Sequence, residues 1–185
     1  DVLSASGSDN KIAWYENDGE ENFTERVIST SAAVARSVFA EDIDGDGDID
    51  VLSASRDDDK IAWYENDGNE NFTAHIISIS ADSAQDVYAE DIDGDGDMDV
   101  LSASSIDNKI AWYENDGNEN FTEQIISTSA VGANSIYSID LDGDGDMDVL
   151  SANIGTGGDD NSDDGTVSWF VNDGEEGFTE QIIST

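Results

Sequence analysis

The chain has no cysteine, no proline and only six lysine and arginine residues among its 185 residues. Without cysteine it can form no disulfide bond and can offer no thiolate to a metal or a substrate. The scarcity of basic residues leaves a formal net charge of −39. This charge argues against nucleic acid or an anionic membrane surface as a partner, because both are bound through basic surfaces. No apolar run approaches the roughly 18 residues that a membrane-spanning helix needs, so membrane insertion is not expected either.

What the sequence does contain is one unit repeated four times. Trp14, Trp63 and Trp112 are 49 residues apart, and Trp169 follows after 57 residues, so the fourth unit carries an insertion. The nonapeptide KIAWYENDG occurs three times and decays to VSWFVNDG in the last unit. A fixed period of this length is the signature of a repeat architecture.

Each unit predicts four short β-strands, typified by VFAEDI, DVLSAS, KIAWYEN and FTERVIST. These runs are β-branched and aromatic, and Gly, Asn and Asp bound them. Asn-Asp-Gly after the third run closes a tight hairpin, because these residues accept a positive φ angle at low cost. In the first KIAWYEN, Ile12 and Trp14 face one way and Ala13 and Tyr15 the other. Both faces are apolar, as expected of a sheet packed between two others.

Four-stranded antiparallel units of this length predict an all-β fold, a β-propeller built of blades of about 49 residues. A β-helix would need a much shorter period. We expect a single domain over residues 1–185, with blades at approximately 1–30, 37–79, 86–128 and 135–185. The first blade is incomplete because its innermost strand is missing. Four blades is the lower limit for a propeller, so further blades from the same parent chain or from a second copy are expected.

The most unusual motif is an acidic loop that leads into three of the four DVLSA runs. It reads DIDGDGDID over Asp42–Asp50 and recurs as DIDGDGDMD and DLDGDGDMD. Five carboxylates in nine residues repel one another unless a cation lies among them. Side-chain oxygens at the first, third, fifth and ninth places and a carbonyl at the seventh suit Ca²⁺, which takes about 6–8 oxygen ligands in forgiving geometry. The candidate ligands of the three calcium sites are Asp42, Asp44, Asp46, Asp48, Asp50, Asp91, Asp93, Asp95, Asp97, Asp99, Asp140, Asp142, Asp144, Asp146 and Asp148.

Other readings of the loop fit less well. An EF-hand would need a glutamate at the twelfth place, where Ser53 stands, and helices on both sides. Zinc or iron would need imidazole or thiolate ligands, and the chain has one histidine, His75. A solvated acidic turn without metal is the remaining alternative. The threefold repetition at a fixed phase favours calcium, in a structural role.

The acidic loop followed by DVLSAS, in phase with a tryptophan strand, resembles the FG-GAP/VCBS repeats of extracellular proteins and, more distantly, the propeller of integrin α subunits. The resemblance implies that the loop joins the two inner strands of a blade. It also implies side-chain ligation of Ca²⁺ by Asp42, Asp44, Asp46 and Asp50, and carbonyl ligation by Asp48, with the same pattern in the other two loops.

The two ends of the predicted blades differ in how much they vary. One end carries the acidic loops and the Asn-Asp-Gly turns, which are nearly identical between units. The other carries the links between blades, the hairpins after DVLSAS, and the insertion at residues 153–165. Repeat proteins often bind through the face that accepts insertions, although these loops could also vary for lack of constraint. The candidate partner-binding residues on this variable end are Arg36, Arg56, Gln85 and Asn134.

Together these features predict a calcium-stabilised, non-enzymatic binding or adhesion module with a protein or glycan ligand. We expect it to be extracellular or at the cell surface, with a signal segment that is not in this chain. Two alternatives remain open. One is a propeller of a polysaccharide-active enzyme, either catalytic or carbohydrate-binding, and the other is a structural spacer or self-assembly unit.

Overall fold

The computed structural model describes residues 1–155 and 164–184, and these residues contain fifteen β-strands. The described residues include no helix that could cross a bilayer. The strands are β1 (Val2–Ser6), β2 (Lys11–Asn17), β3 (Phe23–Ser29), β4 (Ala35–Glu41), β5 (Asp50–Ser55), β6 (Lys60–Asn66), β7 (Phe72–Ser78), β8 (Ala84–Glu90), β9 (Asp99–Ser104), β10 (Lys109–Asn115), β11 (Phe121–Ser127), β12 (Ala133–Ile139), β13 (Asp148–Asn153), β14 (Thr166–Asn172) and β15 (Phe178–Ser184).

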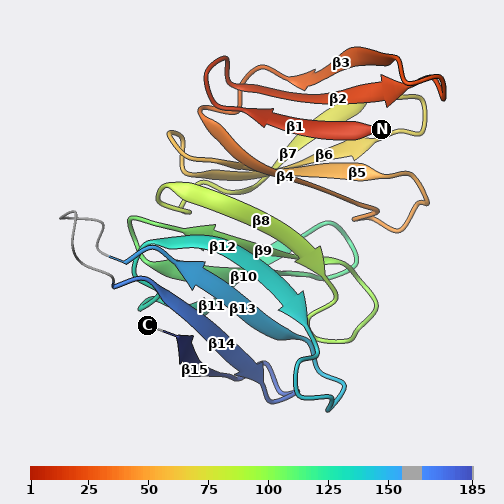
Figure 1. Cartoon of the computed structure of the whole chain (residues 1–185). Helices are drawn as coiled ribbons and strands as arrows, with labels where there is room; N and C mark the ends of the chain where they lie inside the picture. The colour runs from red at the N-terminus through yellow and green to blue at the C-terminus, as the bar shows by residue number, and fades with distance from the viewer. Residues whose placement is uncertain (156–163, 185) are drawn as a thin grey trace.

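The strands form four antiparallel sheets in which each strand pairs with the next along the chain. The first sheet is β1–β2–β3, and the other three sheets are β4–β7, β8–β11 and β12–β15. The first strands of the complete sheets, β4, β8 and β12, lie side by side, and the sheets fan out from them (Figure 1). This is the arrangement of propeller blades around an axis. The predicted all-β propeller, with a first blade that lacks its innermost strand, is confirmed.

The core lies between the sheets, because the blade sheets between two neighbours are apolar on both faces. Trp63 and Leu52 of the second sheet pack with Val100 and Tyr113 of the third. From the opposite face of the third sheet, Trp112 packs against the fourth sheet. Trp63 and Trp112 are each 1% exposed. These indoles are therefore packing residues, and they are not available for stacking on a sugar.

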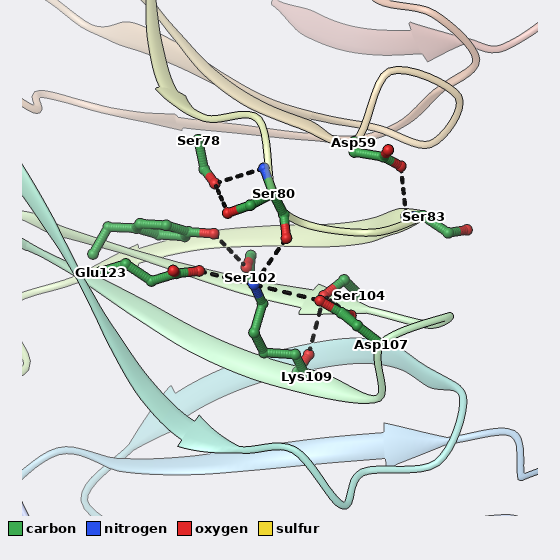
Figure 2. A network of polar contacts seen from close by, with 10 residues as sticks. Asp59, Ser78, Ser80, Ser83, Ser102, Ser104, Asp107, Lys109 and Glu123 are labelled. Carbon is green, nitrogen blue, oxygen red and sulfur yellow. Dashed lines mark hydrogen bonds and ion pairs between the residues drawn. The ribbon is translucent and has the colours of Figure 1, made fainter.

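Polar contacts hold the link between β7 and β8 from both sides (Figure 2). In the link before β8, the Ser83 amide donates to Asp59 Oδ1 of the preceding sheet at 2.9 Å. The Lys109 ammonium of the following sheet donates to the Ser80 carbonyl at 2.9 Å and to Glu123 Oε1 at 2.8 Å. Lys60 makes the corresponding bond to the Ser31 carbonyl at 3.0 Å. Adjacent blades are thus tied through their links as well as through the apolar core.

A β-bulge interrupts the start of each innermost strand. On β4, Ala35 pairs with Ser55 and Ser37 pairs with Ala54, so Arg36 has no place in the ladder. The same irregularity occurs at Gln85 on β8 and at Asn134 on β12. A bulge turns a side chain away from the regular alternation of the strand. The three bulge residues are the ones that the sequence placed at equivalent points on the variable end.

Candidate functional sites

Each acidic loop brings three carboxylates together at the end of an innermost strand. Oxygens of Asp91, Asp93 and Asp99 lie within 4.8 Å of one another, and the same holds for the equivalent aspartates of the other two loops. The two further groups are Asp42, Asp44 and Asp50, and Asp140, Asp142 and Asp148. The first, third and ninth places of the loop therefore form a triad in each of the three complete blades.

The loop backbone holds these carboxylates in position. Asp91 accepts hydrogen bonds from the amides of Gly94 at 2.8 Å and Gly96 at 3.1 Å, one on each oxygen. The chain can turn back on this side chain because both glycines have positive φ angles, 74° and 100°. Asp93 accepts from the Asp95 amide at 3.1 Å. Each bond fixes one direction of an oxygen and leaves its second lone pair free to coordinate.

The ninth aspartate is the buried member of each triad. Asp50, Asp99 and Asp148 are fully buried. Asp99 accepts from the amides of Ile92 at 3.0 Å and Asn115 at 2.8 Å. Burial nevertheless raises the pKa of Asp99 to about 7, and burial also raises the pKa of Asp50. Two backbone donors therefore do not offset the cost of removing the Asp99 charge from water.

The remaining two aspartates of each loop lie outside the triads. Asp95 accepts from the Asp97 amide at 2.9 Å. The Asp97 carboxylate lies against Gly117 of the neighbouring hairpin, where a Cβ atom would clash with its Oδ2 atom. Asp48 and Asp146 lie in the same way against Gly68 and Gly174. Of the four side-chain ligands predicted in each loop, the structure groups the first, third and ninth and leaves the fifth outside the triad. The seventh aspartate was predicted to ligate through its backbone carbonyl.

The triads fit a hard divalent cation. All of their donors are carboxylate oxygens, and among the described residues no lysine, arginine or histidine forms an ion pair with a loop aspartate. A dication would supply the missing positive charge and return the buried aspartate to its ionised form. The predicted metal binding has this geometric basis at three places in the chain.

At the opposite end of the innermost strands, three of the four predicted partner-binding residues come together. Arg36, Gln85 and Asn134 line an open hollow of about 300 Å³ with Ser37, Asp86 and Ser135. The fourth, Arg56, does not line it and pairs instead with Asp57 Oδ1 at 2.7 Å. Most of the predicted insertion, residues 156–163, lies outside the described residues.

Sequence reasoning missed the floor of this hollow. Asp86 accepts from Ser37 Oγ at 2.6 Å and from Ser135 Oγ at 2.9 Å, so it bridges the two flanking blades. It also accepts from the amides of Val87 at 3.1 Å and Ile136 at 3.0 Å. The sequence signal for Asp86 is a departure from the repeat. The equivalent positions of the three units hold Ser37, Asp86 and Ser135, so only the middle unit has an acid there.

His75 contacts two side chains of the neighbouring strand β6. Its Nε2 atom lies 2.7 Å from Glu65 Oε2, and its ring stacks on Trp63 with centroids 4.6 Å apart. The position lies on an outer strand, β7, and His75 belongs to neither candidate site.

The fold and the triads define a repeat propeller with acidic loops between the two inner strands of its blades. A family model described as FG-GAP-like repeat matches residues 1–53, 42–102 and 91–151. The chain therefore belongs to the FG-GAP-like repeat family.

The comparison with solved structures finds a lectin of Agrocybe aegerita, described for its specific recognition of non-reducing terminal N-acetylglucosamine. The match has a TM-score of 0.53 and 15% sequence identity, and it covers 98% of this chain and 65% of the lectin. The chain thus spans about two thirds of the length of that lectin, and the likeness concerns the fold. The comparison with curated proteins finds no match.

Proposed function

We propose that this chain is a calcium-stabilised extracellular binding module without catalytic activity, whose glycan ligand contacts the variable end of the blades. The observation that carries the proposal is that the two ends of the blades offer different kinds of site. Three equivalent carboxylate triads lie at one end, and a hollow lined by non-equivalent side chains lies at the other. The repeated end serves stability and the varied end serves recognition.

Calcium fits the triads better than magnesium for a physical reason. The donors come from a loop that turns at two glycines with positive φ angles, and we expect such a loop to offer its oxygens in an irregular arrangement. Ca²⁺ accepts an irregular shell of oxygens and completes it with water, whereas Mg²⁺ demands a near-ideal octahedron and gives up its waters reluctantly. Weak sites of this kind suit calcium-rich extracellular fluid, which supports the proposed location.

The ligand class is supported by the fold. The lectin that resembles this chain in fold is described for its recognition of non-reducing terminal N-acetylglucosamine, although sites differ widely among proteins that share a fold. Within the described residues, the hollow at the variable end has a polar lining that offers a guanidinium and two amides. Such groups donate and accept the hydrogen bonds that sugar hydroxyls require.

A glycan array probed with the calcium-loaded protein tests the function. The proposal expects selective binding, no release of reducing ends from the bound polysaccharide, and loss of binding after chelation. Release of reducing ends would make the chain part of an enzyme. Self-association without binding to any glycan would make it an assembly unit.

A further inference from the structure

One arginine of this acidic chain has no acidic partner among the described residues. Lys11, Arg26, Arg56, Lys60 and Lys109 each form an ion pair. Arg36, the sixth of the six basic residues, pairs with no carboxylate of the described residues, although the chain carries 45 Asp and Glu. Its side chain is exposed at the rim of the hollow that it lines with Gln85 and Asn134 at the variable end, which we call the axial hollow.

The nearest acid on the floor of the hollow is already satisfied. Asp86 accepts four hydrogen bonds, two from serine hydroxyls and two from backbone amides, between 2.6 and 3.1 Å. These donors stabilise its charge without help from a guanidinium. Arg36 therefore keeps its full set of planar donors for a ligand.

Two neutral side chains, Gln85 and Asn134, lie with the Arg36 guanidinium at the rim of the hollow. The bulges on β4, β8 and β12 take Arg36, Gln85 and Asn134 out of the strand ladders at equivalent points. The Gln85 amide nitrogen is held by the Ser83 carbonyl and by Ser105 Oγ, at 2.9 and 3.1 Å, which leaves its carbonyl oxygen to accept. The Asn134 amide makes no side-chain hydrogen bond with the described residues.

We propose that the axial hollow binds the carboxylate of an acidic sugar, with Arg36 gripping the carboxylate and Asn134 and Gln85 contacting the sugar hydroxyls. A guanidinium fork matches a carboxylate in two parallel hydrogen bonds. A volume of about 300 Å³ is at the small end of ligand sites and suits one sugar residue. The net charge of −39 disfavours a densely charged polyanion, so an isolated uronic acid residue fits best. This inference rests on the proposed glycan-binding function and names the ligand class.

Calorimetric titration with glucuronate, in calcium-containing buffer of low ionic strength, tests the proposal directly. Glucuronate should bind, and glucose, which has no carboxylate, should bind at least about tenfold more weakly. Arg36→Gln should also lower the glucuronate affinity at least about tenfold, because a charge-assisted bidentate contact is lost. Arg56→Gln is the matched control. It removes a partly exposed arginine at the same end of the molecule, one that already pairs with Asp57. The effect of this change should stay within about twofold. Asn134→Ala should weaken glucuronate binding but leave acetate binding unchanged.

Several outcomes would overturn the assignment. Equal losses from Arg36→Gln and Arg56→Gln would show a diffuse charge effect. Acetate binding as tightly as glucuronate would remove the sugar from the recognition, and tighter binding of N-acetylglutamate would point to an acidic peptide. If glucuronate does not bind but the array shows selective binding of neutral glycans, the proposed uronic-acid site is wrong and the proposed function still holds. Absence of both would remove the proposed function itself.

Discussion

At the scale of single residues, the aspartate side chains of one acidic loop fall into two groups that lie in different places. Asp91, Asp93 and Asp99 converge, whereas the Asp97 side chain lies against the neighbouring hairpin. The sequence predicted the loop and all of its oxygen-bearing places. It also predicted side-chain ligands at the first, third, fifth and ninth places, and the structure groups the first, third and ninth. The fifth differs because its direction depends on how the loop turns at its two glycines.

Paired substitutions in the third blade test this separation. Asp93→Asn removes one anionic ligand from a triad and should lower the number of calcium ions bound per chain from about three to about two. Asp97→Asn should leave the number unchanged, because its carboxylate is not part of the triad. Equilibrium dialysis with ⁴⁵Ca gives both numbers. Loss of an ion in Asp97→Asn alone would contradict the assignment.

The stabilisation by calcium should also depend on pH. Burial raises the pKa of Asp99 to about 7, compared with about 3.9 in an unfolded chain. Between these values the calcium-free folded chain holds a proton that the unfolded chain releases, so its stability falls as the pH rises from about 4 to about 7. Calcium requires the ionised carboxylate and must displace that proton.

The difference in melting temperature between calcium-loaded and calcium-free protein is therefore expected to be larger at pH 8 than at pH 6. Differential scanning calorimetry at the two pH values measures it. A difference that stays the same at both would show that Asp99 does not couple to the metal.

At the scale of elements, the period-2 pattern and the Asn-Asp-Gly turns were enough to predict the strands and their order. The two apolar faces of KIAWYEN predicted that a sheet lies between two others, and the burial of Trp63 and Trp112 agrees. The bulges were not predictable in this way. Arg36, Gln85 and Asn134 interrupt the ladders at strand ends, where pairing geometry rather than hydrophobic pattern decides the register.

The lysine ties between blades can be tested by substitution. Lys109→Met removes a buried ammonium that contacts the Ser80 carbonyl and Glu123, and both acceptors lose this donor (Figure 2). It should destabilise the protein by about 2–3 kcal/mol. Lys11→Met is the control, because Lys11 pairs with Asp9 and Glu25 within its own sheet and should cost about 1 kcal/mol or less. Urea unfolding of both variants compares them, and equal losses would argue against a tie between blades.

At the scale of the whole molecule, a charge of −39 works against a compact fold, because like charges repel across the entire surface. The acidic loops concentrate that repulsion at one end of the fan in which β4, β8 and β12 lie side by side (Figure 1). Cations bound in the three triads would relieve it where it is greatest. The central claim is therefore that divalent cations in the triads stabilise the stacked blades.

Thermal unfolding with excess calcium and after chelation, combined with metal analysis of the purified protein, tests this claim most directly. Each ion at about a hundredfold excess over its dissociation constant adds about 2.7 kcal/mol, so three ions should raise the melting temperature by about 15 °C or more. The metal analysis should find about three calcium ions per chain. A melting temperature unchanged by chelation, in protein that carries no metal, would contradict the account.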